Sequence, residues 1–217
     1  MDMQLPLSEI FSSLQGESKY AGYPTTFIRL YGCNMLCTYC DTMYAVRGGK
    51  FKKKSLDYIM NAVKAMRNQH VCITGGEPLL HENTMPLIYE LVERGYTVSI
   101  ETNGGVDLSS HALMRSYIFV MDVKTPCSGM TEKNILSNLD LLGHRDEVKF
   151  VIADRADFDY ALSVLKKFPT IAPVIFSPCF TSNNKSTIMK DLSNWLIEEK
   201  PKNARLGIQI HKIIGLD

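Results

Sequence analysis

The sequence lacks a long hydrophobic run, an excess of either charge, an internal repeat and a low-complexity linker. No apolar stretch approaches the roughly 20 residues that a membrane-spanning helix requires, so we expect no contact with a membrane. The 24 basic and 23 acidic residues leave a formal charge of +1, and such a chain has no strong field to attract nucleic acid. The first residues carry neither the basic nor the apolar region of a signal peptide.

Six cysteines in a chain without a secretory signal favour a reducing compartment. We therefore expect a cytoplasmic protein whose thiols serve as ligands rather than in disulfides. The length of 217 residues fits one sizeable domain, and a hydrophobic content of 45% can fill its core. Cys72, Cys127 and Cys179 stand apart from the other cysteines, and we predict that they are small core or rim residues.

Cys33, Cys37 and Cys40 form a C-x3-C-x2-C loop after a predicted buried strand at 25–31, which Gly32 ends. A loop this short can direct three thiolates to one point while leaving a fourth ligand position empty. Three soft ligands suit an iron–sulfur cluster with one open iron better than a closed zinc site. Two alternatives remain, which are a disulfide with a spare thiol and a zinc loop that takes its fourth ligand from a distant residue.

Apolar runs rich in branched residues alternate with helical patterns along the rest of the chain. This alternation implies a parallel sheet of right-handed crossovers, curved or closed as a barrel. Ser55 is a predicted helix N-cap, because apolar residues follow it at helical spacing. The predicted strands are 25–31, 71–74, 96–101, 117–123, 147–152, 174–177 and 205–210, and the predicted helices are the one after Ser55 and those at 85–94, 131–142, 155–168 and 185–199.

Polar motifs follow the predicted strands at the ends where parallel α/β folds collect reactive groups. In Thr-Gly-Gly-Glu-Pro at 74–78, two glycines leave no Cβ to block a ligand. The alternative is a plain strand-to-helix turn in which Pro78 starts the next element. The motifs occupy 33–42, 74–78, 101–104, 122–126, 177–178 and 209–211.

The cysteine loop, the Gly-Gly-Glu-Pro run and the strand–helix alternation together resemble the radical S-adenosylmethionine (SAM) enzymes. The resemblance implies an α/β fold, a partial (β/α) barrel of mostly parallel strands. It implies that Cys33, Cys37 and Cys40 hold a [4Fe–4S] cluster whose open iron chelates SAM, and that reductive cleavage of SAM yields a radical that abstracts a substrate hydrogen. The implied SAM-binding residues are Tyr39, Cys40, Asp41, Gly75, Gly76, Glu77, Glu101, Thr102, Asp122, Lys124 and Ser177.

Residues 11–17, Phe-Ser-Ser-Leu-Gln-Gly-Glu, carry an amide, a glycine and a carboxylate that together can read the edges of a heterocycle. With Arg29 and the Cys-Asp-Thr at 40–42, this run is similar to the 7-carboxy-7-deazaguanine synthases. That family is a group of lyases that convert 6-carboxy-5,6,7,8-tetrahydropterin to 7-carboxy-7-deazaguanine with loss of ammonia, on the route to queuosine and related 7-deazapurines. The resemblance spans almost the whole chain, and it implies one radical SAM domain over 1–217, with a substrate-binding extension at 1–24 before a partial barrel at 25–217.

The same resemblance implies how the substrate and a magnesium ion are held. Arg29 suits the substrate carboxylate, because an arginine in an apolar strand needs a partner inside the protein. Thr42 is implied to ligate Mg²⁺ beside that carboxylate. The implied substrate-binding residues are Leu14, Gln15, Gly16, Glu17, Arg29, Thr74, His211 and Asp217.

Other partners and other functions stay open at this point. Residues 50–54, Lys-Phe-Lys-Lys-Lys, read as a solvated basic loop, with a docking patch for a reductant such as flavodoxin as the alternative. The family also implies a homodimer. A glycyl-radical activase would share the cysteine loop but lack the Gln-Gly-Glu run at 15–17. A zinc-stabilised binding module without catalysis is the rival from another class, and metal analysis would distinguish it.

Overall fold

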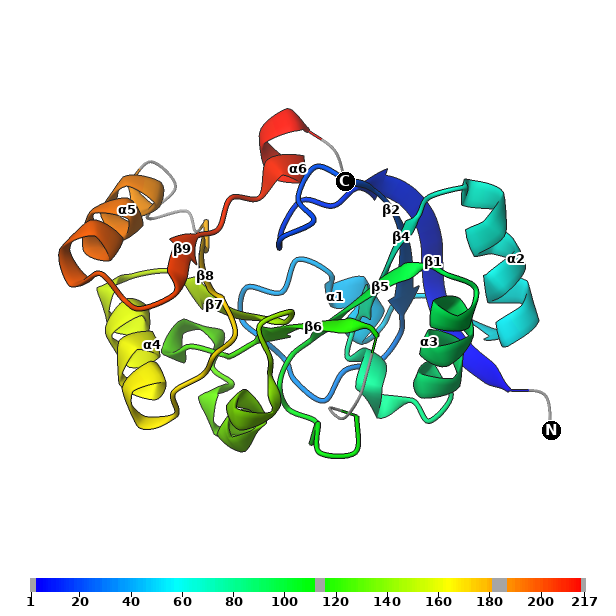
Figure 1. Ribbon diagram of the computed structural model, residues 1–217, viewed down its shortest axis with the longest axis horizontal. Helices are drawn as coiled ribbons and strands as arrows, with labels where there is room; N and C mark the ends of the chain where they lie inside the picture. The colour runs from blue at the N-terminus through cyan, green and yellow to red at the C-terminus, as the bar shows by residue number, and fades with distance from the viewer. Residues whose placement is uncertain (1–2, 112–115, 181–186, 216–217) are drawn as a thin grey trace.

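The computed structural model describes residues 3–111, 116–180 and 187–215 (Figure 1). In these residues the strands form one sheet with the order β3-β1-β2-β4-β5-β6-β7-β8-β9, and the longer helices lie along its outer side (Figure 1). The strands are β1 (Gln4–Leu14), β2 (Pro24–Leu30), β3 (Lys52–Ser55), β4 (His70–Gly75), β5 (Thr97–Thr102), β6 (Ile118–Asp122), β7 (Glu147–Ile152), β8 (Val174–Pro178) and β9 (Ala204–Leu206). The α-helices are α1 (Met43–Val46), α2 (Leu56–Met66), α3 (Thr84–Glu93), α4 (Arg155–Lys167), α5 (Ile188–Glu199) and α6 (Ile210–Ile214), and the 3-10 helices are η1 (Pro78–Leu80), η2 (Pro126–Ser128), η3 (Thr131–Lys133) and η4 (Leu136–Leu141).

The sheet is parallel from β2 through β4 to β9, and only β1 and β3 run antiparallel to their neighbours. This confirms the expected partial barrel of mostly parallel strands. Because the parallel strands all end at one edge, the polar motifs that follow them meet there. The order and direction of the strands alone therefore indicate where the candidate site lies.

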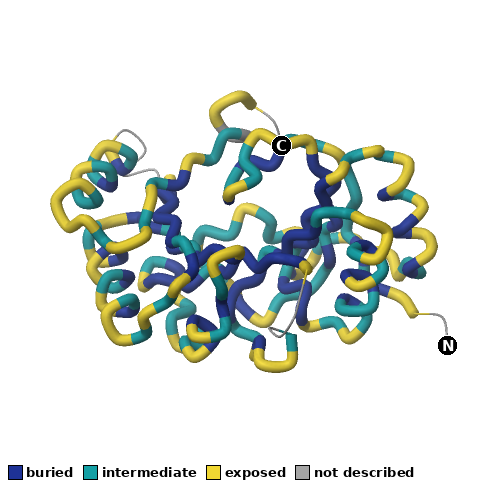
Figure 2. The backbone as a smooth tube through the Cα atoms, in the orientation of Figure 1, coloured by how far each residue is buried: buried dark blue, intermediate teal, exposed yellow. Residues whose placement is uncertain are grey.

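The core lies between the sheet and the helices on its outer side. Figure 2 shows the strands largely buried, with the exposed residues on the outer parts of the helices. Helix α2 begins as predicted, because the Ser55 hydroxyl accepts a hydrogen bond from the Tyr58 amide, and the helix buries Leu56, Ile59, Met60 and Val63. Among the described residues, no helix is both long and apolar enough to span a bilayer.

The predicted helix at 131–142 is wrong. The structure has the short 3-10 helices η3 and η4 there, because asparagine side chains draw the backbone into other contacts. The Asn134 side chain exchanges hydrogen bonds with the backbone of Lys124, and the Asn138 amide group bonds Leu108 N and Val106 O. These partners are distant in sequence, so helical spacing gave no sign of them.

The two ends of the sheet also differ from the prediction. Part of the basic segment predicted to be a loop, residues 52–54, lies in β3, which pairs with the first residues of β1. Lysines on an edge strand discourage pairing with other chains. At the other end, the predicted strand 205–210 stops at Leu206, because the Ile210 amide donates to the Gly16 carbonyl at 2.9 Å and turns the chain toward the N-terminal segment.

His70 is a fully enclosed polar residue at the start of β4. Its Nδ1 lies 2.8 Å from the Thr25 hydroxyl and its Nε2 lies 2.9 Å from the Ser99 hydroxyl. Since the Thr25 hydroxyl donates to the Tyr23 carbonyl, it accepts from Nδ1–H, and Nε2 accepts from Ser99. Burial lowers the pKa of His70 to about 4, so the folded protein keeps the neutral ring.

We expect His70 to make the folded state sensitive to acid. Between pH 6.5 and about 4 the unfolded chain binds a proton at this ring and the folded chain does not, so stability falls as the pH falls. The slope from one such group reaches about 1.4 kcal/mol per pH unit. Denaturant unfolding of the apoprotein at pH 6.5 and pH 5 should show a smaller loss for His70→Gln than for the wild type. Equal losses in both proteins would contradict this role.

Candidate active site

A cavity of about 940 Å³ opens at the carboxyl ends of the parallel strands, on the inner side of the curved sheet. Its volume lies within the ~300–1,000 Å³ typical of ligand sites. Most of the residues predicted for the site line it, namely Leu14, Gln15, Gly16, Glu17, Arg29, Cys33, Cys37, Tyr39, Cys40, Asp41, Thr42, Thr74, Gly75, Gly76, Glu101, Thr102, Asp122 and Lys124.

Two of the predicted site residues do not join this lining, and two others lie partly or wholly outside the described residues. Glu77 is fully buried behind it, and Ser177 is buried in β8. The side chain of His211 and all of Asp217 lie outside the described part of the chain. The structure therefore brings together nearly all of the predicted site while leaving these contacts as predictions.

The cysteine loop is held by two backbone hydrogen bonds, one just before Cys33 and one between Cys37 and Cys40. The Gly32 amide donates to the Ala45 carbonyl at 2.7 Å, and the Thr38 amide donates to the Ser128 carbonyl at 3.1 Å. Gly32 has a φ of 104°, a value that glycine adopts at little cost. Burial raises the pKa of the Cys33 and Cys37 thiols, so binding of a metal there must release protons.

All six cysteines carry free thiols, which disfavours the disulfide alternative. Among the described residues, no group of three or more His, Cys, Asp or Glu side chains comes close enough to hold a single metal ion. The thiolates of a [4Fe–4S] cluster bind different iron atoms and so stand farther apart than the ligands of one ion. Three thiolates, one for each of three irons, are the donor set that such a cluster uses, so the residues present fit it.

The two glycines of the 74–78 motif are required by the chain itself. A Cβ on Gly75 would lie 2.1 Å from the Leu30 carbonyl oxygen, and one on Gly76 would lie 2.0 Å from the Gly32 carbonyl oxygen. The close backbone approach is present, because Gly75 meets the end of β2 and Gly76 meets the start of the cysteine loop. The end of β4 is thus pressed against the start of the cysteine loop and fixes its position.

Glu77 ties this motif to the end of β5. Its carboxylate accepts hydrogen bonds from the amides of Leu79 and Asn103, at 3.0 and 2.6 Å, and from the Thr102 hydroxyl at 2.9 Å. Burial raises the pKa of Glu77, while these donors favour the ionised form. The carboxylate consequently shapes the cavity wall from behind.

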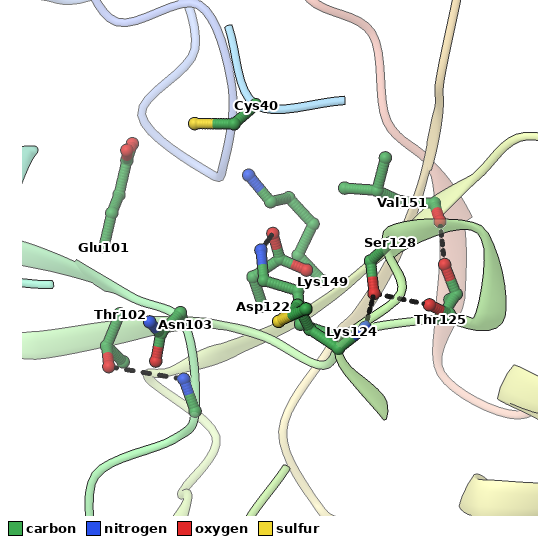
Figure 3. Close-up of polar contacts among 12 residues, drawn as sticks. Cys40, Glu101, Thr102, Asn103, Asp122, Lys124, Thr125, Ser128, Lys149 and Val151 are labelled. Atoms are coloured by element: carbon green, nitrogen blue, oxygen red, sulfur yellow. Dashed lines mark hydrogen bonds and ion pairs between the residues drawn. The ribbon is translucent and has the colours of Figure 1, made fainter. Parts of the chain in front are cut away.

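Carboxylates and lysines alternate on the floor of the cavity. Lys124 pairs with Asp122 at 2.7 Å, and Lys149 pairs with Glu17 at 2.9 Å. In Figure 3 the side chains of Glu101 and Lys149 point toward the same space as the Cys40 thiol. Burial lowers the pKa of Lys149, but Glu17, Asp122 and Glu101 outweigh it and hold that pKa well above its usual value, so Lys149 stays charged.

The N-terminal segment closes one side of the cavity. The Gln15 amide donates to Glu101 at 3.4 Å, and its own oxygen accepts from the Glu17 amide. Glu17 accepts from Lys149 through one carboxylate oxygen and from Gln209 through the other. These contacts join the segment to β5, to β7 and to the chain after β9.

Three further lining residues have hydroxyl or guanidinium groups near the cavity. Arg29 Nε pairs with Glu9 at 2.7 Å, which supplies the partner that an arginine in this strand requires. The Thr74 hydroxyl donates to Glu101 at 2.9 Å. Thr42 precedes α1 but makes no capping hydrogen bond with its side chain, and its hydroxyl lies 3.8 Å from the Cys40 sulfur.

Comparison with known proteins agrees with this geometry. The Radical SAM superfamily matches residues 27–191. A 7-carboxy-7-deazaguanine synthase of Koribacter versatilis is 40% identical, over 97% of this chain and 96% of that protein. Another, from Methanospirillum hungatei, is 39% identical over 98% of this chain and 86% of its own. This chain belongs to the 7-carboxy-7-deazaguanine synthase family, within the radical SAM superfamily.

Solved structures confirm the fold of this family in the chain. The crystal structure of QueE from Escherichia coli superposes with a TM-score of 0.74 at 24% identity, over 96% of this chain and 95% of that one. Streptococcus suis SuiB bound to S-adenosylmethionine gives a TM-score of 0.57 at 13% identity, over 81% of this chain and 47% of that one. Membership sets aside the activase and zinc-module alternatives. It also implies a [4Fe–4S] cluster and SAM as cofactors.

Three polar residues that line the cavity of this family member, Asn103, Lys149 and Gln209, were not among the predicted site residues. Asn103 lies within the motif at 101–104 and directly follows two predicted site residues, so its place in that motif was the available signal. Lys149 stands within an apolar strand, where alternation alone can also place a polar residue. Gln209 lies in the motif at 209–211, but its role was not visible locally, because its partner Glu17 lies at the other end of the chain.

Proposed function

We propose that this chain is a radical SAM carbon–nitrogen lyase (EC 4.3.99.3) that converts 6-carboxy-5,6,7,8-tetrahydropterin to 7-carboxy-7-deazaguanine with loss of ammonia, in queuosine-type 7-deazapurine biosynthesis. The observation that carries this proposal is that one cavity is lined both by the cysteine loop and by the Gln-Gly-Glu segment at 15–17. A generic radical SAM enzyme needs only the first of these. The second brings amide and carboxylate groups to the place where a substrate would meet the cofactors.

Cys33, Cys37 and Cys40 would hold the cluster, since all three line one cavity and supply three soft ligands. When bound, the cluster and SAM supply the radical chemistry that removes a hydrogen atom from C6 of the pterin. The chain's own part is to orient SAM and to exclude water with apolar walls. The residues proposed to contact SAM are Tyr39, Cys40, Asp41, Gly75, Gly76, Glu101, Thr102, Asp122 and Lys124, while Glu77 and Ser177 support them from behind.

The pterin would lie against the N-terminal segment. The Glu17 carboxylate can accept two N–H donors from the aminopyrimidine edge, and Gly16 leaves the ring access to the backbone. Arg29 presents the rest of its guanidinium to the substrate carboxylate, because the Glu9 pair engages Nε. Leu14, Gln15 and Thr74 complete this set, and contacts from His211 and Asp217 stay predictions.

Thr42 is proposed to ligate Mg²⁺ beside the substrate carboxylate. Thr42 lines the cavity, and its hydroxyl, 3.8 Å from the Cys40 sulfur and not used in helix capping, can serve as a hard oxygen ligand. We expect Thr42→Ala to lower product formation several-fold while SAM cleavage persists. The measurement is a magnesium titration of both activities, with Thr42→Ser as the control that keeps the hydroxyl. Wild-type behaviour of Thr42→Ala at limiting magnesium would show that this role is wrong.

The chain is proposed to act as one domain in which residues 1–24 serve the substrate and 25–217 form the barrel. The basic residues at 50–54 offer a surface for an acidic reductant such as flavodoxin, since Lys52 and Lys53 are exposed on an edge strand. A cytoplasmic homodimer is the expected form. Gel filtration and a salt-dependent reduction rate would test these two expectations.

The decisive experiment is an anaerobic assay of reconstituted, reduced protein with SAM, Mg²⁺ and carboxytetrahydropterin. Appearance of the deazaguanine chromophore, with release of ammonia, is the expected result. SAM cleavage without the chromophore would mean that the cavity takes another substrate. Absence of both activities from protein that holds iron and sulfide would contradict the proposal as a whole.

A further inference from the structure

Asn103 makes a contact with the first cysteine of the loop that the proposed chemistry does not use. Its side-chain Nδ2 lies 3.4 Å from the Cys33 sulfur and donates toward it. The same nitrogen lies 2.8 Å from Asn34 Oδ1. Asn103 itself is 8% exposed, so its amide group has little choice of partner.

The orientation of this amide is fixed by its other atoms. Asn103 Oδ1 accepts from the Gly105 amide at 2.9 Å, which leaves Nδ2 as the group that faces the sulfur. Asn34 Nδ2 in turn donates to the Gly105 carbonyl at 2.9 Å, so the two asparagines and Gly105 form a closed set of hydrogen bonds. The Glu77 carboxylate anchors the Asn103 backbone from behind.

Gly105 is the residue that allows this arrangement. A Cβ there would lie 2.5 Å from the Met35 methyl carbon, 3.0 Å from Asn34 Nδ2 and 3.1 Å from Asn103 Oδ1. A side chain there would displace the Met35 methyl group and crowd the amide groups of Asn34 and Asn103. Asn34, Asn103 and Gly105 therefore all contribute to the N–H···S contact.

We infer that Asn103 is a positioning residue that holds the Cys33 thiolate and raises the reduction potential of the cluster it binds. An N–H donor to a ligand sulfur favours the more negative, reduced cluster, and such hydrogen bonds are among the levers that set cluster potentials. This inference rests on the proposed ligation by Cys33. The hydrogen bond from Asn103 would in addition control how readily the cluster accepts the electron needed for SAM cleavage.

The test is an EPR-monitored redox titration of reconstituted protein, which reads the cluster without turnover. Asn103→Leu removes the donor at similar volume, and Asn103→Asp keeps the shape but replaces the donor with a carboxylate. At the wild-type midpoint, the ratio of reduced to oxidised cluster should fall about tenfold in Asn103→Leu, a downward shift of about 59 mV, and further in Asn103→Asp. Asn34→Ala is the matched control, because it disturbs the loop but keeps the Asn103 donor, and its ratio should stay within about threefold of the wild type.

Iron and sulfide content separates the possible failures. Unchanged midpoints in cluster-loaded Asn103 variants would overturn the inference and leave the proposed function intact. An equal shift in Asn34→Ala would also overturn it, since loop shape and not the donor would then set the potential. Loss of iron from both Asn103 variants would show a purely structural role, and absence of iron from the wild type would overturn the ligation itself.

Discussion

Replacing Cys37 by alanine is expected to abolish product formation, SAM cleavage and cluster content together. Cys37 lies between the other two cysteines of the loop, and its thiol lines the same cavity. Two remaining thiolates cannot hold three irons of a cluster and present the fourth to SAM. Iron and sulfide analysis after anaerobic reconstitution, the visible spectrum of the protein and the anaerobic assay measure the three losses on one preparation.

The matched control for this variant is Cys127→Ala. Cys127 lies next to the cysteine loop, where its carbonyl accepts the Thr38 hydroxyl, but its thiol does not line the cavity. Removing that thiol leaves the carbonyl in place, so iron content and activity should stay within about twofold of the wild type. Iron retained by Cys37→Ala, or lost from Cys127→Ala, would show that the cluster ligands are wrongly assigned.

The strands and the edge at which the site lies could be predicted from the sequence because both depend on local pattern. Parallel strands buried on both faces read as short apolar runs, and the polar residues that follow them must gather at one edge. The cysteine loop is equally local, since its three cysteines lie within eight residues. For these features the residues near one another in sequence carry the information.

The features that could not be predicted depend on partners far apart in the chain. Asn138 prevents a helix by bonding Leu108, 30 residues away, and Glu77 acts on Asn103, 26 residues away. A pattern of apolar spacing cannot reveal either contact. The two glycines in the 74–78 motif show the same limit, because the backbone atoms that require them belong to Leu30 and Gly32, far earlier in the chain.

Replacing Lys149 by methionine is expected to weaken use of the pterin without preventing SAM cleavage. Lys149 and Glu17 form an ion pair at 2.9 Å in which each side chain is only 15% exposed. Removing one partner leaves the Glu17 carboxylate enclosed without its counter-charge and free to turn from its position, which costs roughly 2–3 kcal/mol, or about 30- to 150-fold. We expect this loss in kcat/KM for the pterin, because Glu17 is the proposed reader of its edge.

Kinetics measured separately for SAM and for the pterin distinguish loss of the ion pair from a general defect of the enzyme. The KM for SAM and the rate of SAM cleavage without pterin should change little in Lys149→Met, whereas Lys149→Arg, which keeps the charge, should recover part of the pterin activity. Lys166→Met, on the last turn of α4, is the control for loss of one lysine elsewhere. A charge that acts only by holding Glu17 in place should affect pterin use and not SAM cleavage. If Lys149→Met lowered both by the same factor, this role would be wrong, and the lysine would support the cavity as a whole.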